Sequence, residues 1–385
     1  MESKLIVMKF GGSSVSNKER IFSVSKKIKE KVMEGNKIVV VVSAQGDTTD
    51  NLLELSKEIN ENPNLRELDV LLSAGEQISI SLLSMALGSI GVKSISLTGW
   101  QAGIQTCNCY GNSKIVNIFT DRIEKELQSN DVIVVAGFQG ININEDITTM
   151  GRGGSDTSAV ALAAALKTKK CKIYTDVDGV YTADPRIVKK SKKIDEISYD
   201  EMINLADNGA QVLHNRSVRL AKKYGIEISV LSSMKNSDEG TKVKELDFSA
   251  NPISSVAIDE NLFALNLNSK CFNFAIDKIR NEKISIADIF FSVDYSLLLL
   301  NMSNIEAILR ILPENCDYKI DTNVSKITVI PSNYDNMLEN FSQFKDIIDY
   351  SKIKYIYVCK NICFVLDKTF GREFLNKIHD CLKMD

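Results

Sequence analysis

The sequence predicts an α/β fold, in which a mostly parallel sheet is sandwiched by helices, followed by smaller C-terminal α+β modules. Near-continuous apolar runs, such as residues 37–42 and 132–136, are typical of parallel strands that are buried on both faces. Amphipathic segments alternate with these runs, as the crossover helices of a parallel sheet do. Near residue 245 the regular alternation of strands and helices gives way to a linker-like segment, which marks the start of the second region.

The N-terminal elements follow in regular order. Apolar runs predict strands at 4–10, 37–42, 93–97, 132–136 and 171–175. Helical periodicity predicts helices near 16–34, 50–60, 65–88, 119–129, 156–167, 199–206 and 214–224. Ligands of such sheets bind beyond the carboxyl ends of the strands. We therefore expect the site near Lys9, Ser43, Phe138 and Thr175, which stand at these ends.

The C-terminal region, residues 253–385, follows a linker-like segment and predicts two β-α-β-β-α units, at about 253–312 and 318–385. The first unit is expected to contain strands at 253–258, 262–267, 284–290 and 296–301 and helices at 272–281 and 304–311. The second is expected to contain strands at 325–330, 352–358 and 362–366 and helices at 335–345 and 370–382. No catalytic constellation is visible there, so this region is either a dimerisation platform or an effector-sensing domain.

The composition excludes several classes of function. The net charge of −3 gives no electrostatic footprint for nucleic acid. No apolar stretch approaches the length of a membrane span, and residues 1–10 lack a signal peptide's apolar region, so we expect a cytoplasmic protein without a membrane partner. The eight cysteines include no C-x-x-C pair and are expected to be reduced thiols. Two histidines argue against a histidine metal site and against a Ser-His-Asp triad.

The most informative segment is the glycine-rich stretch 148–158, which runs directly into an alanine-rich helix. The amino end of a helix collects unpaired N–H groups and suits phosphate or carboxylate. Arg152 can hold a carboxylate through two parallel hydrogen bonds. The alternative is a plain connector, in which Ser155 or Asp156 caps the helix.

A second glycine turn follows the first predicted strand. Lys9 stands at the strand end, and Gly11, Gly12 and Ser13 lead towards the next helix. A strand, a glycine turn and a helix form a phosphate cradle, although this turn has neither the G-x-G-x-x-G nor the Walker spacing. Alone the turn is a weak signal, but together with the stretch 148–158 it predicts phosphoryl chemistry.

Several motifs resemble the aspartate kinase family in their order and spacing, over residues 4 to about 243. They are Met8-Lys9-Phe10-Gly11-Gly12-Ser13-Ser14-Val15, Val42-Ser43-Ala44, Ser73-Ala74-Gly75-Glu76, Ala136-Gly137-Phe138-Gln139-Gly140, the stretch 148–156, the stretch 174–186, and Gly209-Ala210-Gln211-Val212-Leu213-His214. The resemblance implies the amino-acid kinase fold with C-terminal ACT-type modules. It also implies ATP-dependent phosphorylation of the β-carboxylate of L-aspartate, the first step of lysine, threonine, methionine and diaminopimelate synthesis.

The resemblance also implies residue roles. Lys9, Arg152 and Asp156 are expected to be catalytic, with Mg²⁺ arriving on the ATP phosphates and few direct protein ligands. The substrate is expected to contact Ser43, Thr49, Glu76, Phe138, Arg152 and Ser155. The nucleotide is expected to contact Lys9, Gly11, Gly12, Ser13, Thr175, Asp176, Tyr181, Arg186 and Gln211.

Simpler explanations exist for some of these residues. Glu76 opens an amphipathic helix and could merely favour the helix dipole. Asp176 could be a turn residue, and Arg186 could be a surface arginine. His214 lies in an apolar context and is interpreted as structural.

The sequence departs from the family at two places. Many relatives carry Lys where Gln211 stands, so the nucleotide role there is in doubt. The ACT modules of the family bind lysine or threonine beside an Asp-x-Pro-Gly turn, whereas residues 268–272 here contain neither Pro nor Gly. A homodimer through these modules is the family expectation. A kinase for another carboxylate, such as glutamate, and a non-catalytic homologue remain the alternatives.

From the altered turn we expect feedback inhibition to be weakened, lost or changed, because glycine lets backbone amides approach an effector closely. Titration of kinase activity with lysine, threonine and both together tests this. Ordinary micromolar-to-millimolar inhibition by lysine would contradict it.

Overall fold

The structure is a computed structural model that describes residues 4–210, 212–235, 237–246, 255–282, 284–291, 295–313, 316–331, 341–342, 344–358 and 360–382. Its contacts divide the chain into two compact units, which are described one at a time. The first contains Met1–Val180, Lys193–Ala206 and Gln211–Asp247, and the second contains Tyr181–Lys192, Asp207–Ala210 and Phe248–Asp385.

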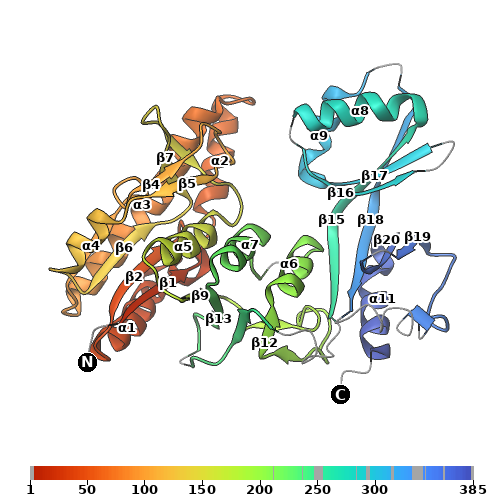
Figure 1. The fold of residues 1–385 in the computed structure, drawn as a ribbon. Helices are drawn as coiled ribbons and strands as arrows, with labels where there is room; N and C mark the ends of the chain where they lie inside the picture. The colour runs from red at the N-terminus through yellow and green to blue at the C-terminus, as the bar shows by residue number, and fades with distance from the viewer. Residues whose placement is uncertain are drawn as a thin grey trace. The chain divides into compact units, whose positions relative to one another are not determined.

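The first unit is built on an eight-stranded sheet of order β12-β14-β13-β9-β1-β2-β6-β3 (Figure 1). All neighbours run parallel except β13 and β14. The strands are β1 (Leu5–Phe10), β2 (Lys37–Val42), β3 (Ser94–Leu97), β6 (Val132–Ala136), β9 (Lys170–Thr175), β12 (Glu196–Ser198), β13 (Glu227–Ser232) and β14 (Thr241–Lys244). The central strands are apolar and β-branched, and β2 is buried from Ile38 to Val42 because both of its faces are covered.

Helices cover both faces of this sheet. They are α1 (Lys18–Met33), α2 (Thr48–Ile59), α3 (Leu65–Ser89), α4 (Asp121–Leu127), α5 (Gly154–Ala165), α6 (Tyr199–Asp207) and α7 (Asn215–Tyr224), with the 3-10 helix η1 (Gly12–Val15). Apolar residues of α1 and α3 form one core with alternate residues of β1, β2 and β6. Helix α5 lies on β1, β2 and β9, and α7 packs on α5. The predicted fold class is confirmed.

A small four-stranded sheet of order β5-β4-β7-β8 was not expected from the sequence. Its strands are β4 (Ile104–Thr106), β5 (Ile115–Ile118), β7 (Gln139–Ile141) and β8 (Ile147–Thr149). Strands of three or four residues carry too little alternation to be recognised. The sheet matters for function, because β8 leads directly into the glycine-rich loop.

Helix α3 is long and apolar enough, by length and composition, to cross a membrane. Half of that apolar window is buried inside the protein, as expected for the core helix of a globular unit. It is the only such helix among the residues that the structure describes, and it is weak evidence for a span.

The second unit contains one six-stranded antiparallel sheet of order β16-β17-β15-β18-β20-β19. Its strands are β15 (Ser255–Asn268), β16 (Ile286–Phe291), β17 (Tyr295–Asn301), β18 (Tyr318–Ile330), β19 (Ile353–Val358) and β20 (Ile362–Asp367). Its helices are α8 (Ser269–Asn281), α9 (Ile305–Ile311) and α11 (Lys368–Cys381), with η2 (Met302–Asn304). Two further short strands, β10 (Val180–Tyr181) and β11 (Lys193–Ile194), precede this region in the chain.

This sheet differs from the expected pair of separate units. The strands expected at 253–258 and 262–267 are one strand, β15, with register shifts between Asp259 and Ala264. Strand β18 begins earlier than expected and pairs with β15 along most of its length. The helix expected at 335–345 lies largely outside the described residues. Two ACT-like halves therefore share one sheet through two long strands.

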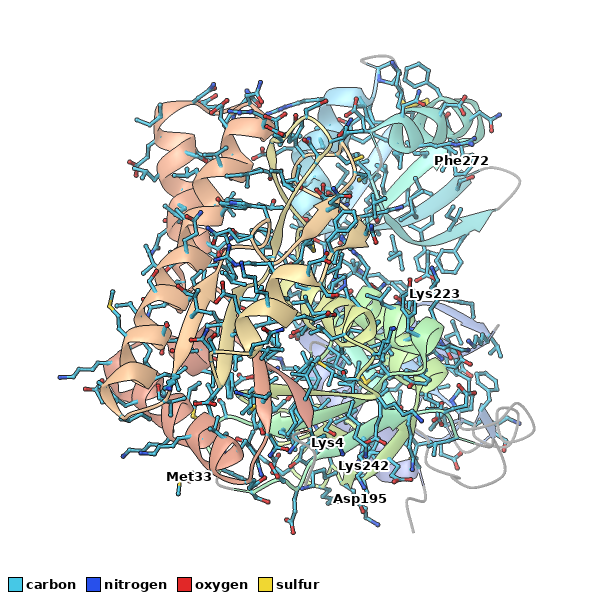
Figure 2. The ribbon with its side chains drawn as sticks, turned by 60° about the vertical axis from the view of Figure 1, so that its left-hand side comes forward. Lys4, Met33, Asp195, Lys223, Lys242 and Phe272 are labelled. Carbon is cyan, nitrogen blue, oxygen red and sulfur yellow. A yellow bond between two sulfur atoms is a disulfide. The ribbon has the colours of Figure 1, made fainter. Side chains whose placement is uncertain are left out.

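Helices α8 and α9 pack on one half of this sheet, and α11 packs on the other. Phe272 of α8 is buried in the first of these cores (Figure 2). In the first unit, by contrast, the apolar side chain of Met33 at the end of α1 is 77% exposed. The two cores are separate clusters, as expected for a repeated module.

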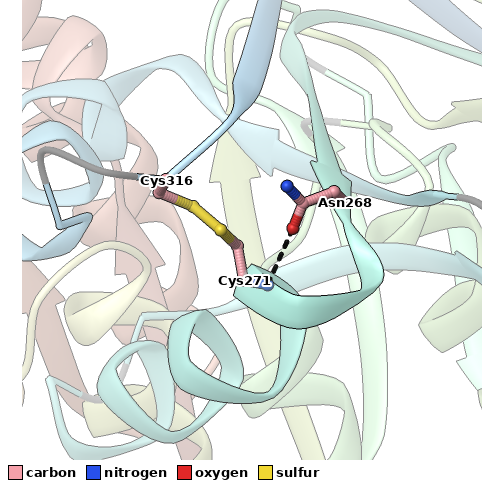
Figure 3. Close-up of a disulfide and its surroundings, with 3 residues drawn as sticks. All are labelled: Asn268, Cys271 and Cys316. Carbon is pink, nitrogen blue, oxygen red and sulfur yellow. Dashed lines mark hydrogen bonds between the residues drawn. A yellow bond between two sulfur atoms is a disulfide. The ribbon is translucent and has the colours of Figure 1, made fainter.

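A disulfide links Cys271, in the first turn of α8, to Cys316, which precedes β18 (Figure 3). The expectation that all the cysteines are reduced is therefore wrong for this pair. The two cysteines are 45 residues apart in the sequence, so spacing did not suggest pairing, but the fold brings their Cα atoms to 5.8 Å. That separation is within the range that a disulfide spans.

We expect the denatured protein to titrate two fewer free thiols before reduction than after it, because Cys271 and Cys316 are bonded. Quantitative thiol labelling under denaturing conditions measures this difference. The Cys316→Ser variant should abolish the difference, whereas Cys381→Ser, at a free cysteine, should keep it. Equal counts before and after reduction of the native sequence would exclude the bond.

Candidate active site

The carboxyl ends of four neighbouring strands form one aligned row. Phe10 of β1 pairs with Tyr174 of β9 on one side and with Val42 of β2 on the other. Val42 in turn pairs with Ala136 of β6. The segments that follow these strands therefore leave from a single edge, which is where ligands bind in open parallel sheets.

A buried ion pair lies just inside this edge. Lys9 is the next-to-last residue of β1, Asp156 is in the first turn of α5, and the lysine Nζ is 2.6 Å from the carboxylate Oδ1. Each residue is only 9% exposed. Removing one member of a buried pair costs about 3–5 kcal/mol, because the remaining charge is left without a partner. The two side chains therefore hold each other at the end of the strand.

The turn after β1 places backbone amides beside this lysine. Gly11 and Gly12 follow the strand directly, and η1 then carries Ser13, which is exposed. A Cβ atom on Gly12 would lie 2.5 Å from the carbonyl oxygen of Ala44, so only glycine lets this turn pack on the segment after β2. The turn after β1 is thus packed closely against the segment that follows β2.

Glu76 is a buried carboxylate on α3 that points at the same segment. It is 2% exposed, and its Oε1 accepts a hydrogen bond of 2.9 Å from the N–H of Ala44. Its Oε2 has no hydrogen-bond partner among the described residues. Burial raises the pKa of Glu76 to about 7, against the smaller opposing effect of the Ala44 hydrogen bond. A buried carboxylate with one free oxygen is suited to a cationic ligand.

The other residues predicted to contact the substrate lie at or near the same edge. Ser43 follows β2 and donates its N–H to the Phe10 carbonyl, and Thr49 is in the first turn of α2. Both are half-buried. Ser155 is buried in the first turn of α5, one residue before Asp156.

Phe138 follows β6 in a left-handed backbone conformation, with φ of 67°. Such a conformation is costly for a residue with a side chain and occurs often at ligand sites. Its N–H donates to Ser158 Oγ at 3.1 Å, and its carbonyl accepts from the Met150 N–H at 2.9 Å. These two bonds fix the half-buried aromatic side chain between β6 and the glycine-rich loop.

The glycine-rich loop connects β8 to α5. Gly151 and Gly153 have φ of 70° and 69°, and Arg152 between them is exposed. A Cβ atom on Gly153 would lie 2.2 Å from the Cβ of His214, so the loop packs tightly on the start of α7. His214 caps α7, because its Nδ1 accepts the N–H of Arg216 at 3.3 Å. The structural interpretation of His214 agrees with this cap.

The residues predicted for the nucleotide fall into three groups. Thr175 ends β9 and donates its hydroxyl hydrogen bond to the exposed Asp176, at the same edge as Lys9. Tyr181 and Arg186 belong to the second unit, where Arg186 pairs with Asp184 at 2.7 Å. Gln211 lies outside the described residues.

The sequence did not reveal three residues near the glycine-rich loop. Asp69 and Arg216 accept from or donate to the residues that lead into it, and Asn112 accepts from Arg216. Asp69 is fully buried and accepts the Thr149 N–H, and Arg216 donates to the Met150 carbonyl. One available signal was the position of Asp69, seven residues before Glu76 and so on the same face of α3. Nothing in the sequence pointed to the other two.

Within the described ranges, no group of three or more His, Cys, Asp and Glu side chains could hold a metal ion. The edge instead offers one lysine in an amide-rich turn, one buried carboxylate with a free oxygen, and one exposed arginine on a glycine loop. A lysine with amides suits a phosphate, and the carboxylate and arginine suit the two charges of an amino acid.

Comparisons with known proteins agree with this chemistry. The amino acid kinase family matches residues 4–232. An aspartokinase of Bacillus sp. (strain MGA3) is 48% identical over 308 residues, which are 80% of this chain and 71% of that protein. Aspartokinase 2 of Bacillus subtilis (strain 168) is 40% identical over 350 residues, or 91% of this chain and 81% of that protein.

A solved structure of E. coli aspartokinase III, in complex with aspartate and ADP, has the same fold. Its TM-score is 0.82, over 98% of this chain and 100% of that chain, at 22% identity. The aspartate kinase of Clostridium acetobutylicum has a TM-score of 0.71 over 98% of this chain, at 20% identity.

We expect Glu76→Gln to stabilise the protein at neutral pH in the absence of ligands. The unfolded chain ionises Glu76 near its ordinary pKa of 4.5, whereas the folded protein keeps it protonated up to about 7. The free energy of unfolding therefore falls as the pH rises between these values and is level above them. At about pH 8 the variant should be more stable by about 3 kcal/mol.

Urea unfolding across this pH range measures the effect, with Glu54→Gln, at an exposed position on α2, as the matched control. Parallel pH profiles for the native sequence and Glu76→Gln would show that Glu76 is not the buried, proton-binding group described above.

Proposed function

The chain belongs to the aspartokinases of the amino acid kinase family, and we propose that it transfers the γ-phosphoryl group of ATP to the β-carboxylate of L-aspartate. The product is 4-phospho-L-aspartate, an acyl phosphate. The observation that carries this proposal is the buried Lys9–Asp156 pair, 2.6 Å apart, between a glycine turn and the amino end of α5.

The chemistry requires positioning and charge neutralisation rather than a strong base. The β-carboxylate of aspartate is already ionised at neutral pH, so no group has to remove a proton from the nucleophile. Phosphoryl transfer develops negative charge on the transferring oxygens. Lys9 neutralises that charge, Gly11, Gly12 and Ser13 pack around the phosphates, and Asp156 keeps the ammonium of Lys9 at the strand end.

The aspartate subsite follows from the remaining charges. The free Oε2 of Glu76 accepts the substrate ammonium, which restores the ionised form of a carboxylate that burial otherwise keeps protonated. Arg152 holds the α-carboxylate through parallel hydrogen bonds. Phe138 forms one wall, and Ser43, Thr49 and Ser155 border the pocket.

ATP is the phosphoryl donor, and Mg²⁺ supplies charge neutralisation on its phosphates when bound. The carboxylate of Asp156, which is buried at the same edge, would help to hold that ion and its bound water. Thr175 and Asp176 face the nucleotide. The nucleotide roles of Tyr181, Arg186 and Gln211 remain part of the proposal.

Assembly, control and location are further parts of the proposal. We expect a homodimer through the ACT-like modules, an enzyme of lysine, threonine and methionine synthesis, and a cytoplasmic location where ATP is supplied. Weakened control by lysine or threonine is supported by the first turn of α8, where the Oδ1 of Asn268 accepts the N–H of Cys271 at 2.9 Å (Figure 3). That amide is occupied by its own chain, so an effector gains less there.

Two alternatives are distinguished by one assay. Glutamate has the same α-ammonium and α-carboxylate as aspartate, so the two charged subsites accept either acid and the assay must compare them, whereas a non-catalytic homologue would not need the buried Lys9–Asp156 pair. With hydroxylamine added to trap the acyl phosphate and release inorganic phosphate, we expect the hydroxamate to form from ATP and L-aspartate in preference to L-glutamate. No product from either acid would favour the non-catalytic homologue.

We expect Lys9→Ala and Asp156→Asn each to lower kcat by about 10²- to 10³-fold, because each removes preorganised charge at the transferring group. The matched control is Lys4→Ala, at an exposed lysine immediately before the same strand. Its kcat should equal that of the native sequence. A folded Lys9→Ala variant with native turnover would refute the role of Lys9.

A further inference from the structure

Residues from two different helices form hydrogen bonds with the end of β8 and the start of the glycine-rich loop. Asp69 reaches them from α3, and Arg216 reaches them from α7. Neither residue has a role in the transfer step described above. Their contacts converge on two consecutive residues, Thr149 and Met150.

On the α3 side, the fully buried Asp69 accepts three backbone or side-chain donors. Thr149 donates both its N–H, at 3.0 Å, and its hydroxyl. The Gly111 N–H donates to both carboxylate oxygens at 3.0 Å. The last residue of β8 is therefore tied to α3 at a point two helical turns before Glu76, since seven residues span about 10.5 Å of helix.

On the α7 side, Arg216 uses both terminal nitrogens. Each donates to the Met150 carbonyl at 2.7 Å and to Asn112 Oδ1 at 2.6–2.7 Å. The guanidinium is partly buried, and burial lowers the pKa of Arg216, although an arginine side chain stays protonated in proteins. A planar group with several fixed donors is required for this pattern, which a lysine ammonium does not reproduce.

The segment 111–113 joins the two sides. Gly111 is held by Asp69, Asn112 is held by Arg216, and the Ser113 N–H donates to the Thr149 carbonyl at 2.8 Å. The contact of Gly153 with His214 adds a second attachment to α7, three residues beyond Met150. Arg152 therefore lies on a short arch that is fixed at both ends.

We propose that Asp69 and Arg216 form a clamp that positions the Arg152 arch relative to Glu76, and that this spacing selects aspartate over longer acidic amino acids. The inference rests on the proposed function, in which Glu76 takes the substrate ammonium and Arg152 the α-carboxylate. With both α-substituents held at fixed points, the length of the side chain decides whether its carboxylate reaches the phosphoryl group at Lys9. One added methylene misplaces the nucleophile.

The physical basis is that Glu76 and Asp69 stand on one helix. The arch is tied to α3 through Asp69, so the separation of the two α-substituent subsites is set by a rigid element rather than by the loop. The Arg216 contacts restrain the arch from the opposite side. Loss of either contact lets the arch move, and displacements of about 1 Å are enough to reduce catalysis strongly.

The test compares two clamp variants, Arg216→Lys and Asp69→Asn, with the control variant Arg219→Gln. Arg219 is an exposed arginine on α7, the helix that carries Arg216. We expect each clamp variant to raise the KM for aspartate about 10-fold, to leave the KM for ATP unchanged, and to reduce the aspartate-to-glutamate ratio of kcat/KM about 10-fold. The control should keep native values. Thermal unfolding of each variant, with activity scaled to folded protein, separates positioning from loss of fold.

Asn112→Ala keeps the inference testable if the buried variants fail to fold, because Asn112 is exposed and its loss removes one acceptor of Arg216. It should raise the KM for aspartate and relax selectivity in the same direction. Folded variants with an unchanged KM for aspartate and unchanged selectivity would overturn the clamp. Absence of aspartate phosphorylation by the native sequence would instead overturn the proposed function.

Discussion

The buried ion pair between Lys9 and Asp156 is the interaction on which the site depends. It joins the end of the central strand β1 to the first turn of α5, so it fixes the strand edge and the helix that closes the glycine-rich loop with one contact. A lysine buried without its carboxylate would be strongly destabilising, and a carboxylate buried alone equally so. The sheet thus carries a cation at the end of β1 that is largely shielded from bulk solvent.

The substrate side of the site is arranged around α3. This helix carries Glu76, whose Oε2 has no hydrogen-bond partner among the described residues, and Asp69, which accepts hydrogen bonds from Thr149 just before the loop that contains Arg152. In the proposed function, the cost of burying the ionised form of Glu76 is offset when the substrate ammonium binds. The sheet therefore carries the charge of Lys9, the helix that of Glu76 and the loop that of Arg152.

The sequence predicted most of the strands of the large sheet, because they are long apolar runs. It also singled out Lys9, Glu76, Arg152 and Asp156, which lie in short motifs beside these strands and helices, and their roles stay a prediction. Nothing in the sequence pointed to Arg216, and only the seven-residue spacing to Glu76 pointed to Asp69, since tertiary packing alone creates their contacts with residues 66 and 80 positions away. The strands of the small sheet were too short to show alternation. The sequence predicted two strands where the structure has the single strand β15. The predicted break coincides with the register shifts in the pairing of β15 with β18.

The central claim is that the ammonium group of Lys9 neutralises charge on the transferring phosphoryl group. Supplying an ammonium ion to a variant that lacks Lys9 tests this claim most directly. The Lys9→Ala variant, assayed for aspartate phosphorylation with added ethylammonium, should regain part of its kcat while its KM for ATP and aspartate stays close to the native value. Methylated quaternary ammonium of similar charge should not restore activity, because it lacks N–H donors. Native turnover without the amine, or no gain with ethylammonium in a variant that binds both substrates normally, would contradict the account.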